Sequence, residues 1–114
     1  MSRAVPTLVF AIALAAVAHG AQSGKPHDFG VSLEPGAIHE ECLRLERGAR
    51  RRYEWSSSAP VDFNIHFHRG DDVIYPVKRD GATKSSDSFT AKSTEDYCWM
   101  WSAKSAVNIR GSID

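Results

Sequence analysis

The stretch VDFNIHFH, residues 61 to 68, constrains the fold more than any other part of the chain. Apolar side chains (Val61, Phe63, Ile65, Phe67) alternate with polar ones, so each kind faces one side of an extended backbone. This period of two predicts a strand with one buried and one polar face. The same period returns before it, around Tyr53 to Trp55, and near the end of the chain in YCWMW and SAVNIRGSID.

Turn-forming sequences rich in Gly, Pro and Asp separate these runs at short intervals, which is typical of an antiparallel all-β fold. We therefore predict a small antiparallel β-sandwich with one disulfide. Strands are expected near residues 30–34, 37–45, 49–56, 61–68, 72–77, 86–91, 96–102 and 105–113. The stretch RDGATKSSDS, residues 79–88, is expected to be an exposed loop because it is rich in serine and charge.

The first twenty residues resemble a secretory signal peptide: Arg3 precedes an uncharged apolar run, which small residues follow. Cleavage is expected before His19 or Ala21, and an uncleaved anchor is the alternative. Residues 21–35 are expected to form a flexible lead-in, and residues 36–114 a single domain. The mature chain is then secreted or periplasmic, with no transmembrane span.

Two cysteines, Cys42 and Cys98, lie in the expected domain. An even number of cysteines in a small exported domain predicts a disulfide. A reactive or metal-binding pair of thiols is the alternative, although the C-x-x-C spacing that such sites favour is absent.

Charge argues against a nucleic-acid partner. The chain has 14 basic and 14 acidic side chains, and loss of Arg3 with the leader leaves a formal charge of −1, whereas binding to phosphates needs a basic surface. The local exception is GARRR, in which Arg50 and Arg52 are candidates for contact with an anionic partner. A solvated strand face is the simpler interpretation of this run.

The order of these motifs resembles the GOLD (Golgi dynamics) domain, a small β-sandwich of vesicle cargo receptors and some lipid-transfer proteins. The resemblance covers residues 36–113. It rests on the aromatic strand at residues 53–55, the small-residue turn and Val-Asp-Phe at residues 60–63, the strand at Phe89, and the Tyr97-x-Trp99-x-Trp101 strand. The receptors also join an early strand to the late aromatic strand by a disulfide, which Cys42 and Cys98 resemble.

The resemblance implies a non-catalytic binding module without a cofactor, whose partner is a protein, a lipid or a glycan. It does not extend to the receptors' coiled coil, membrane span and sorting tail, so a role in vesicle traffic is not carried over. The order of residues near Cys98 also departs from the receptors, because Cys98 follows Tyr97 directly.

His66 and His68 are candidate metal ligands, because two histidines at i and i+2 of a strand share one face. Zn²⁺ and Cu²⁺ accept neutral imidazole. A periplasmic metal-binding protein is therefore the alternative function, and a solvated polar face is the simpler interpretation. A blue-copper site is not favoured, because no histidine follows Cys98 to complete its ligand set.

Trp99 and Trp101 alternate with Cys98 and Met100, so they are expected in the core; an exposed tryptophan would instead be a binding anchor. The chain lacks a G-x-S-x-G elbow and an apolar setting for a pair of carboxylates. We therefore expect no enzymatic activity.

Overall fold

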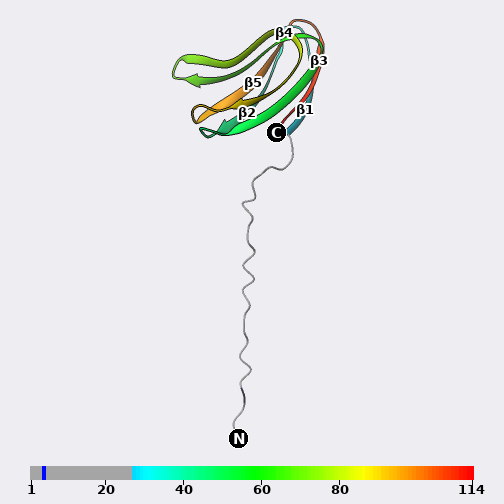
Figure 1. Cartoon of the computed structure of the whole chain (residues 1–114). Coiled ribbons are helices and arrows are strands. Elements are labelled where there is room, and N and C mark those ends of the chain that lie inside the picture. The colour runs from blue at the N-terminus through cyan, green and yellow to red at the C-terminus, as the bar shows by residue number, and fades with distance from the viewer. Residues whose placement is uncertain (1–3, 5–26) are drawn as a thin grey trace.

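The computed structural model describes residue 4 and residues 27–114 of the chain, and it is all-β over the latter. Apart from residue 4, the expected signal peptide lies outside the described residues, as do residues 21–26 of the lead-in. Six strands make up the fold (Figure 1): His27–Leu33 (β1), Ile38–Leu45 (β2), Arg50–Arg69 (β3), Asp72–Thr90 (β4), Glu95–Ala103 (β5) and Val107–Ile113 (β6). Among the residues described, no helix is long and apolar enough to cross a membrane.

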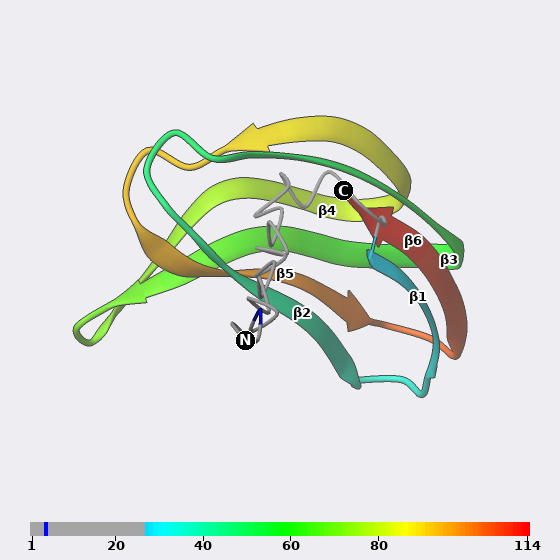
Figure 2. The same ribbon diagram turned by 90° about the horizontal axis from the view of Figure 1, so that it is seen from below.

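The long strand β3 organises a single antiparallel sheet. β4 pairs along one side of β3, while on its other side β6 pairs with residues 53–57 and β5 with residues 61–66. β1 then pairs with β6, and β2 with β5. The sheet curls (Figure 2), so that its two halves face each other as two layers. We call the half with β1, β6, the start of β3 and the end of β4 the β1 layer, and the half with β2, β5, the end of β3 and the start of β4 the β2 layer.

The bends that form two layers occur where the ladder is irregular. The register of β3 against β4 shifts between Ser56 and Val61, a stretch that contains Pro60. On β4, Gly81 has a positive φ of 64° and its amide donates to Oδ1 of Asp62 at 2.9 Å. Glycine adopts this conformation without the strain that a Cβ would add, so β4 turns from one layer to the other without ending.

Two sequence predictions are therefore corrected. Residues 79–88 are not a loop but part of β4, which as an edge strand tolerates exposed serine and lysine side chains. The strands expected at residues 49–56 and 61–68 are one continuous strand. The polar composition of residues 79–88 is compatible with a loop and with an edge strand. Pairing of this segment with β3 makes it a strand.

Residues 27–33 form β1, which pairs with β6 along its whole length, so the expected flexible lead-in is wrong for this segment. A hydrogen bond from His27 of β1 to Glu41 of β2 joins the two strands, and His39 of β2 holds the same carboxylate. Nε2 of His27 lies 2.8 Å from one carboxylate oxygen and Nε2 of His39 lies 3.0 Å from the other. Phe29 packs beside them on the ring of Trp101, with a centroid distance of 4.7 Å.

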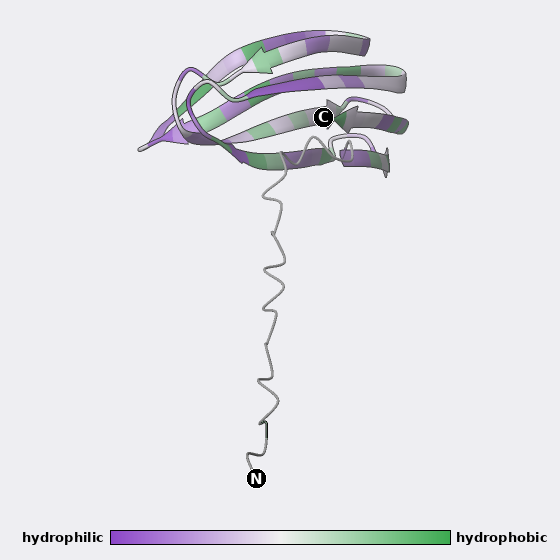
Figure 3. Ribbon diagram, turned by 60° about the horizontal axis from the view of Figure 1, so that its bottom comes forward, coloured by the Kyte–Doolittle hydropathy of each residue, from purple (hydrophilic) through white to green (hydrophobic). Residues whose placement is uncertain are grey.

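Aromatic rings join the two layers. Along the strands, hydrophobic and hydrophilic residues alternate (Figure 3), and the hydrophobic ones fill the space between the layers. Trp101 of the β2 layer meets Trp55 of the β1 layer edge-on at 6.2 Å, and Trp99 meets Tyr53 in the same way. The indole N–H groups of Trp55, Trp99 and Trp101 are buried and have no hydrogen-bond partner.

Trp99 and Trp101 are completely buried, with an exposed fraction of 0%. They belong to the core, as the alternation predicted, and their possible role as a binding surface is wrong. The physical reason is that both side chains point from β5 toward the opposite layer, where the rings of the β1 layer cover them.

The predicted disulfide between Cys42 and Cys98 is confirmed. The two residues lie directly opposite each other in the ladder between β2 and β5, with their Cα atoms 4.1 Å apart. Both side chains lie on the outer face of the β2 layer, because they alternate with the buried residues of their strands.

Candidate functional site

The outer face of the β2 layer carries the large hydrophobic side chains that the described residues leave exposed. These are Ile38 of β2 and Val73 and Tyr75 of β4, with exposed fractions of 57%, 39% and 47%. Val73 lies opposite His68 in the ladder, and the ring of Tyr75 lies 5.8 Å from that of His66. Ile38 lies apart from this pair, because its ladder partner Ser102 is opposite Asp62. Exposed apolar side chains on one face mark a candidate interaction surface.

His66 occupies the middle of this face, yet it is only 4% exposed. The rings of His68 and Tyr75 lie 5.4 Å and 5.8 Å from its own ring. On the other side, Cys98 of β5 lies opposite it in the ladder. The sequence placed His66 on the outer face correctly, but the interpretation of a solvated polar face is wrong at this residue because its neighbours cover it.

The hydrogen bonding of His66 fixes its tautomer. Nδ1 lies 2.7 Å from Oδ1 of Asn64, and because a carbonyl oxygen only accepts, Nδ1 carries the proton. The lone pair of Nε2 is then free, and this atom lies 3.7 Å from Oε1 of Glu40. Burial lowers the pKa of His66; Glu40 opposes this shift and His68 adds to it. Two electron-rich atoms therefore face each other with no hydrogen bond between them.

The predicted pair of metal ligands, His66 and His68, does share one face, with ring centroids 5.4 Å apart. Within residues 27–114, however, the cluster of three potential metal ligands does not include these two histidines. It consists of Glu40, Cys42 and Cys98, with ligand atoms within 4.8 Å of one another, and both sulfurs are already bonded. Sequence reasoning missed Glu40, although its position two residues before Cys42 on a strand places it on the same face.

The arginines of GARRR do not form one basic patch. Arg50 and Arg52 are exposed, whereas Arg51 between them is half-buried, because successive side chains of a strand point to opposite faces. Nη1 of Arg51 donates to the carbonyl of Arg50 at 2.9 Å. Arg52 lines a small hollow together with Asp114, so its charge has an acidic neighbour.

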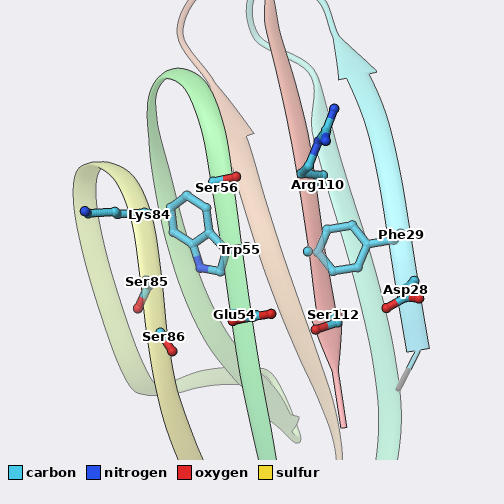
Figure 4. Close-up of a pocket in the computed structure, with 11 residues that line it drawn as sticks. Asp28, Phe29, Glu54, Trp55, Ser56, Lys84, Ser85, Ser86, Arg110 and Ser112 are labelled. Carbon is cyan, nitrogen blue, oxygen red and sulfur yellow. The ribbon is translucent and has the colours of Figure 1, made fainter. Parts of the chain in front are cut away.

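The outer face of the β1 layer holds a polar depression of about 830 Å³. Its lining residues all come from the strands of this layer, so the depression lies on the outside of the sandwich. Figure 4 shows two rows of side chains across the strands: Lys84, Ser56 and Arg110 in one row, and Ser86, Glu54, Ser112 and Asp28 in the other. The rings of Phe29 and Trp55 also line the depression, between these two rows. The two outer faces differ in that the large exposed hydrophobic side chains among the described residues belong to the β2 layer.

No family model matches the chain, and no curated protein matches it. Among solved structures, the chain is similar to Aeromonas hydrophila PliG, a periplasmic lysozyme inhibitor of g-type lysozyme. The two share 13% identity at a TM-score of 0.53, over 82% of this chain and 90% of that one. A de novo designed double-stranded β-helix is similar at 13% identity and a TM-score of 0.46, over 77% of this chain and 99% of that one.

The likeness to PliG shows a shared small all-β fold. The resemblance to the GOLD domain stays a prediction, because no family model supports it.

Proposed function

We propose that this chain is an exported, non-catalytic binding protein that binds a protein partner through the outer face of the β2 layer. The observation that carries this proposal is the position of Ile38, Val73 and Tyr75, which all lie on this face. Apolar and aromatic side chains at the centre of a contact supply most of the binding energy in protein interfaces. The depression in the matching face of the β1 layer is lined in part by Phe29 and Trp55, but neither is among the large hydrophobic side chains that are exposed.

The charges around this face favour a protein over a lipid surface. Glu40 lies on the face, Arg44 pairs with Asp96, and the ammonium group of Lys78 lies 5.7 Å from the ring of Tyr75. Both signs of charge are interspersed there, as in the polar rim of a protein interface. A membrane-binding face would instead carry an excess of basic side chains. A glycan would need several exposed rings for stacking, and Tyr75 is the exposed ring of this face.

The similarity to PliG narrows the class of partner that should be tested first. That protein is a periplasmic inhibitor of g-type lysozyme. This chain combines the same kind of fold with a disulfide and an expected export signal. We infer that the partner is an enzyme that degrades the cell wall, with g-type lysozymes as the first candidates. In this proposal the chain acts by covering a surface of the enzyme, which requires no catalytic group of its own.

The test is direct binding of the purified mature chain to an immobilised g-type lysozyme, together with the rate at which that lysozyme clears a bacterial cell-wall suspension. We expect inhibition, and at least about a tenfold loss of affinity for Tyr75→Ala, as for a central aromatic contact. Lys84→Ala is the matched control, because it changes an exposed residue of the same strand on the β1 layer. Absence of binding would exclude this class of partner, and equal effects of the two variants would exclude the proposed face.

A second candidate function is metal binding through His66 and His68. The observation that favours it is the free lone pair on Nε2 of His66, 3.7 Å from a carboxylate oxygen of Glu40. Calorimetric titration with Zn²⁺ and Cu²⁺ tests it in the disulfide-linked protein. Affinity no better than millimolar, or affinity unchanged in the double variant His66→Ala/His68→Ala, would rule this function out.

A further inference from the structure

Three potential ligands for a transition metal lie together on the outer face of the β2 layer, and a fourth, His66, lies beside one of them. One oxygen of Glu40 and the sulfurs of Cys42 and Cys98 lie within 4.8 Å of one another, and Oε1 of Glu40 lies 3.7 Å from Nε2 of His66. His66 and Cys98 are also opposite each other in the ladder between β3 and β5. The ligands come from three adjacent strands, whose pairing holds them in place.

His66 already has the arrangement of a metal ligand. In metalloproteins a ligating imidazole donates its second ring N–H to a neighbouring acceptor, which fixes the tautomer and the orientation of the ring. Asn64 provides this acceptor at 2.7 Å, and the remaining nitrogen points toward Glu40. Because Nε2 and Oε1 are both acceptors, a cation between them would relieve their repulsion.

We propose that Cys42, Cys98, Glu40 and His66 bind Zn²⁺ when the disulfide is reduced, so that the disulfide and the metal are alternative states of one site. In the oxidised chain the two sulfurs are bonded to each other and only Glu40 and His66 are available. In the reduced chain two thiolates, one imidazole and one carboxylate complete a four-coordinate set. Thiolates and imidazole are the ligands that Zn²⁺ prefers in tetrahedral sites.

The chemical steps balance with a dithiol as the reductant. Its two thiols reduce the Cys42–Cys98 bond, which gives two cysteine thiols and the oxidised, disulfide form of the reductant. Zn²⁺ then replaces the two thiol protons, which are released to the solvent. In the reverse direction a disulfide oxidant accepts two electrons from the thiolates and is reduced to two thiols with protons from the solvent, while the Cys42–Cys98 bond re-forms and Zn²⁺ is released.

The fold supplies a reason why the site should outlast the disulfide. Cys42 and Cys98 are joined across two strands that pair along their whole length, from Ile38 with Ser102 to Leu45 with Glu95. The inner faces of these strands are packed on the aromatic core. Glu40 is partly exposed, with 41% of its side chain accessible, so its carboxylate is free to move toward a bound ion.

The proposal is tested by titrating the mature chain with Co²⁺, a spectroscopic substitute for Zn²⁺, after reduction and removal of the reductant without oxygen. We expect one Co²⁺ per reduced chain, with thiolate-to-cobalt charge-transfer absorption and visible bands typical of tetrahedral geometry, and neither in the oxidised chain. Zn²⁺ should displace Co²⁺. Near-ultraviolet circular dichroism of the reduced chain reports in parallel whether the core stays folded.

Variants identify the ligands. We expect Glu40→Gln and His66→Gln each to lower the affinity of the reduced chain for Co²⁺ by at least about tenfold, as for loss of one ligand. Asp96→Asn is the matched control, since it removes an exposed carboxylate from the same face, and it should leave the affinity unchanged. Equal affinity in all three variants, or a reduced chain that is unfolded both with and without Zn²⁺, would overturn the proposal. This outcome is independent of lysozyme binding, which is measured with the oxidised chain.

Discussion

Replacement of Gly111 by alanine should destabilise the fold more than the size of one methyl group suggests. Gly111 lies on β6, opposite Phe29 of β1 and Trp55 of β3. A Cβ at this position would lie 2.6 Å from the carbonyl oxygen of Glu54, 2.7 Å from Cζ of Phe29 and 2.7 Å from Cβ of Trp55. Two of these three atoms belong to or directly adjoin the backbone of β3, so they cannot move without displacing the strand.

The expected cost follows from this geometry. Adding a methyl group to a close-packed site costs about 1–3 kcal/mol. In a domain of this size, each kcal/mol lost from the free energy of unfolding lowers the melting temperature by about 4–8 °C. A cost in the middle of the range, about 2 kcal/mol, therefore corresponds to a fall of about 8–16 °C. The Phe29 ring would lose its place over β6, so its packing on Trp101 should weaken as well.

The assay is urea and thermal unfolding of the mature, oxidised chain, followed by near-ultraviolet circular dichroism. Gly30→Ala is the matched control. Gly30 is the neighbour of Phe29 on β1, and a Cβ there would have no atom within 4 Å. Alanine at that position should be neutral or should stabilise the fold by about 0.4–1 kcal/mol, because it restricts the unfolded chain. Equal unfolding midpoints for the two variants would refute the argument that close approach requires glycine at residue 111.

Three further predictions concern the disulfide, the buried histidine and the contact between β1 and β2. The double variant Cys42→Ser/Cys98→Ser opens a loop with a sequence separation of 56. Its free energy of unfolding should fall by about 4 kcal/mol in the chain-entropy model, and it should remain folded near 25 °C. Unfolded protein at that temperature would contradict this prediction. Because burial lowers the pKa of His66 in the folded chain, the unfolded chain takes up a proton first as the pH falls, so the free energy of unfolding should decrease below about pH 6.5. Urea midpoints near pH 7.5 and 5.5 should differ less in His66→Gln than in the wild type, and an identical difference would assign the acid sensitivity to other groups. Glu41→Gln weakens the hydrogen bonds from His27 and His39. It should lower the free energy of unfolding by only about 1 kcal/mol, because the contact with His27 is partly exposed. Faster hydrogen exchange confined to β1 would support this prediction, and unchanged exchange there would count against it.

The candidate site was only partly predictable from the sequence. Alternation placed His66 and His68 on one outer face, and the cysteine count predicted the disulfide beside them. The burial of His66 was not predictable, because it depends on Tyr75 of β4 and on the neighbours across the sheet. The approach of Glu40 to His66 likewise depends on the order of β2, β5 and β3 in space, since these residues belong to separate strands.

Serine-rich residues 79–88 show the limit of composition as a guide. Their polarity is equally compatible with a loop and with an edge strand, since both are exposed to solvent. Pairing of this segment with β3 decided for a strand. The same pairing joined residues 49–56 and 61–68 into one long strand, although Pro60 and the serines before it are typical of a turn.

The sequence by itself determined the all-β class, the inward side of each main strand and the partner of each cysteine. The reason is that a strand has a period of two, so the sides of its residues are a local property. Tertiary structure decided that one bent antiparallel sheet forms two layers, that Phe29 crosses β6 at Gly111, and that Val73 and Tyr75 lie beside His68 and His66. These features depend on contacts between residues far apart in the chain, and local alternation carries no information about which strands become neighbours.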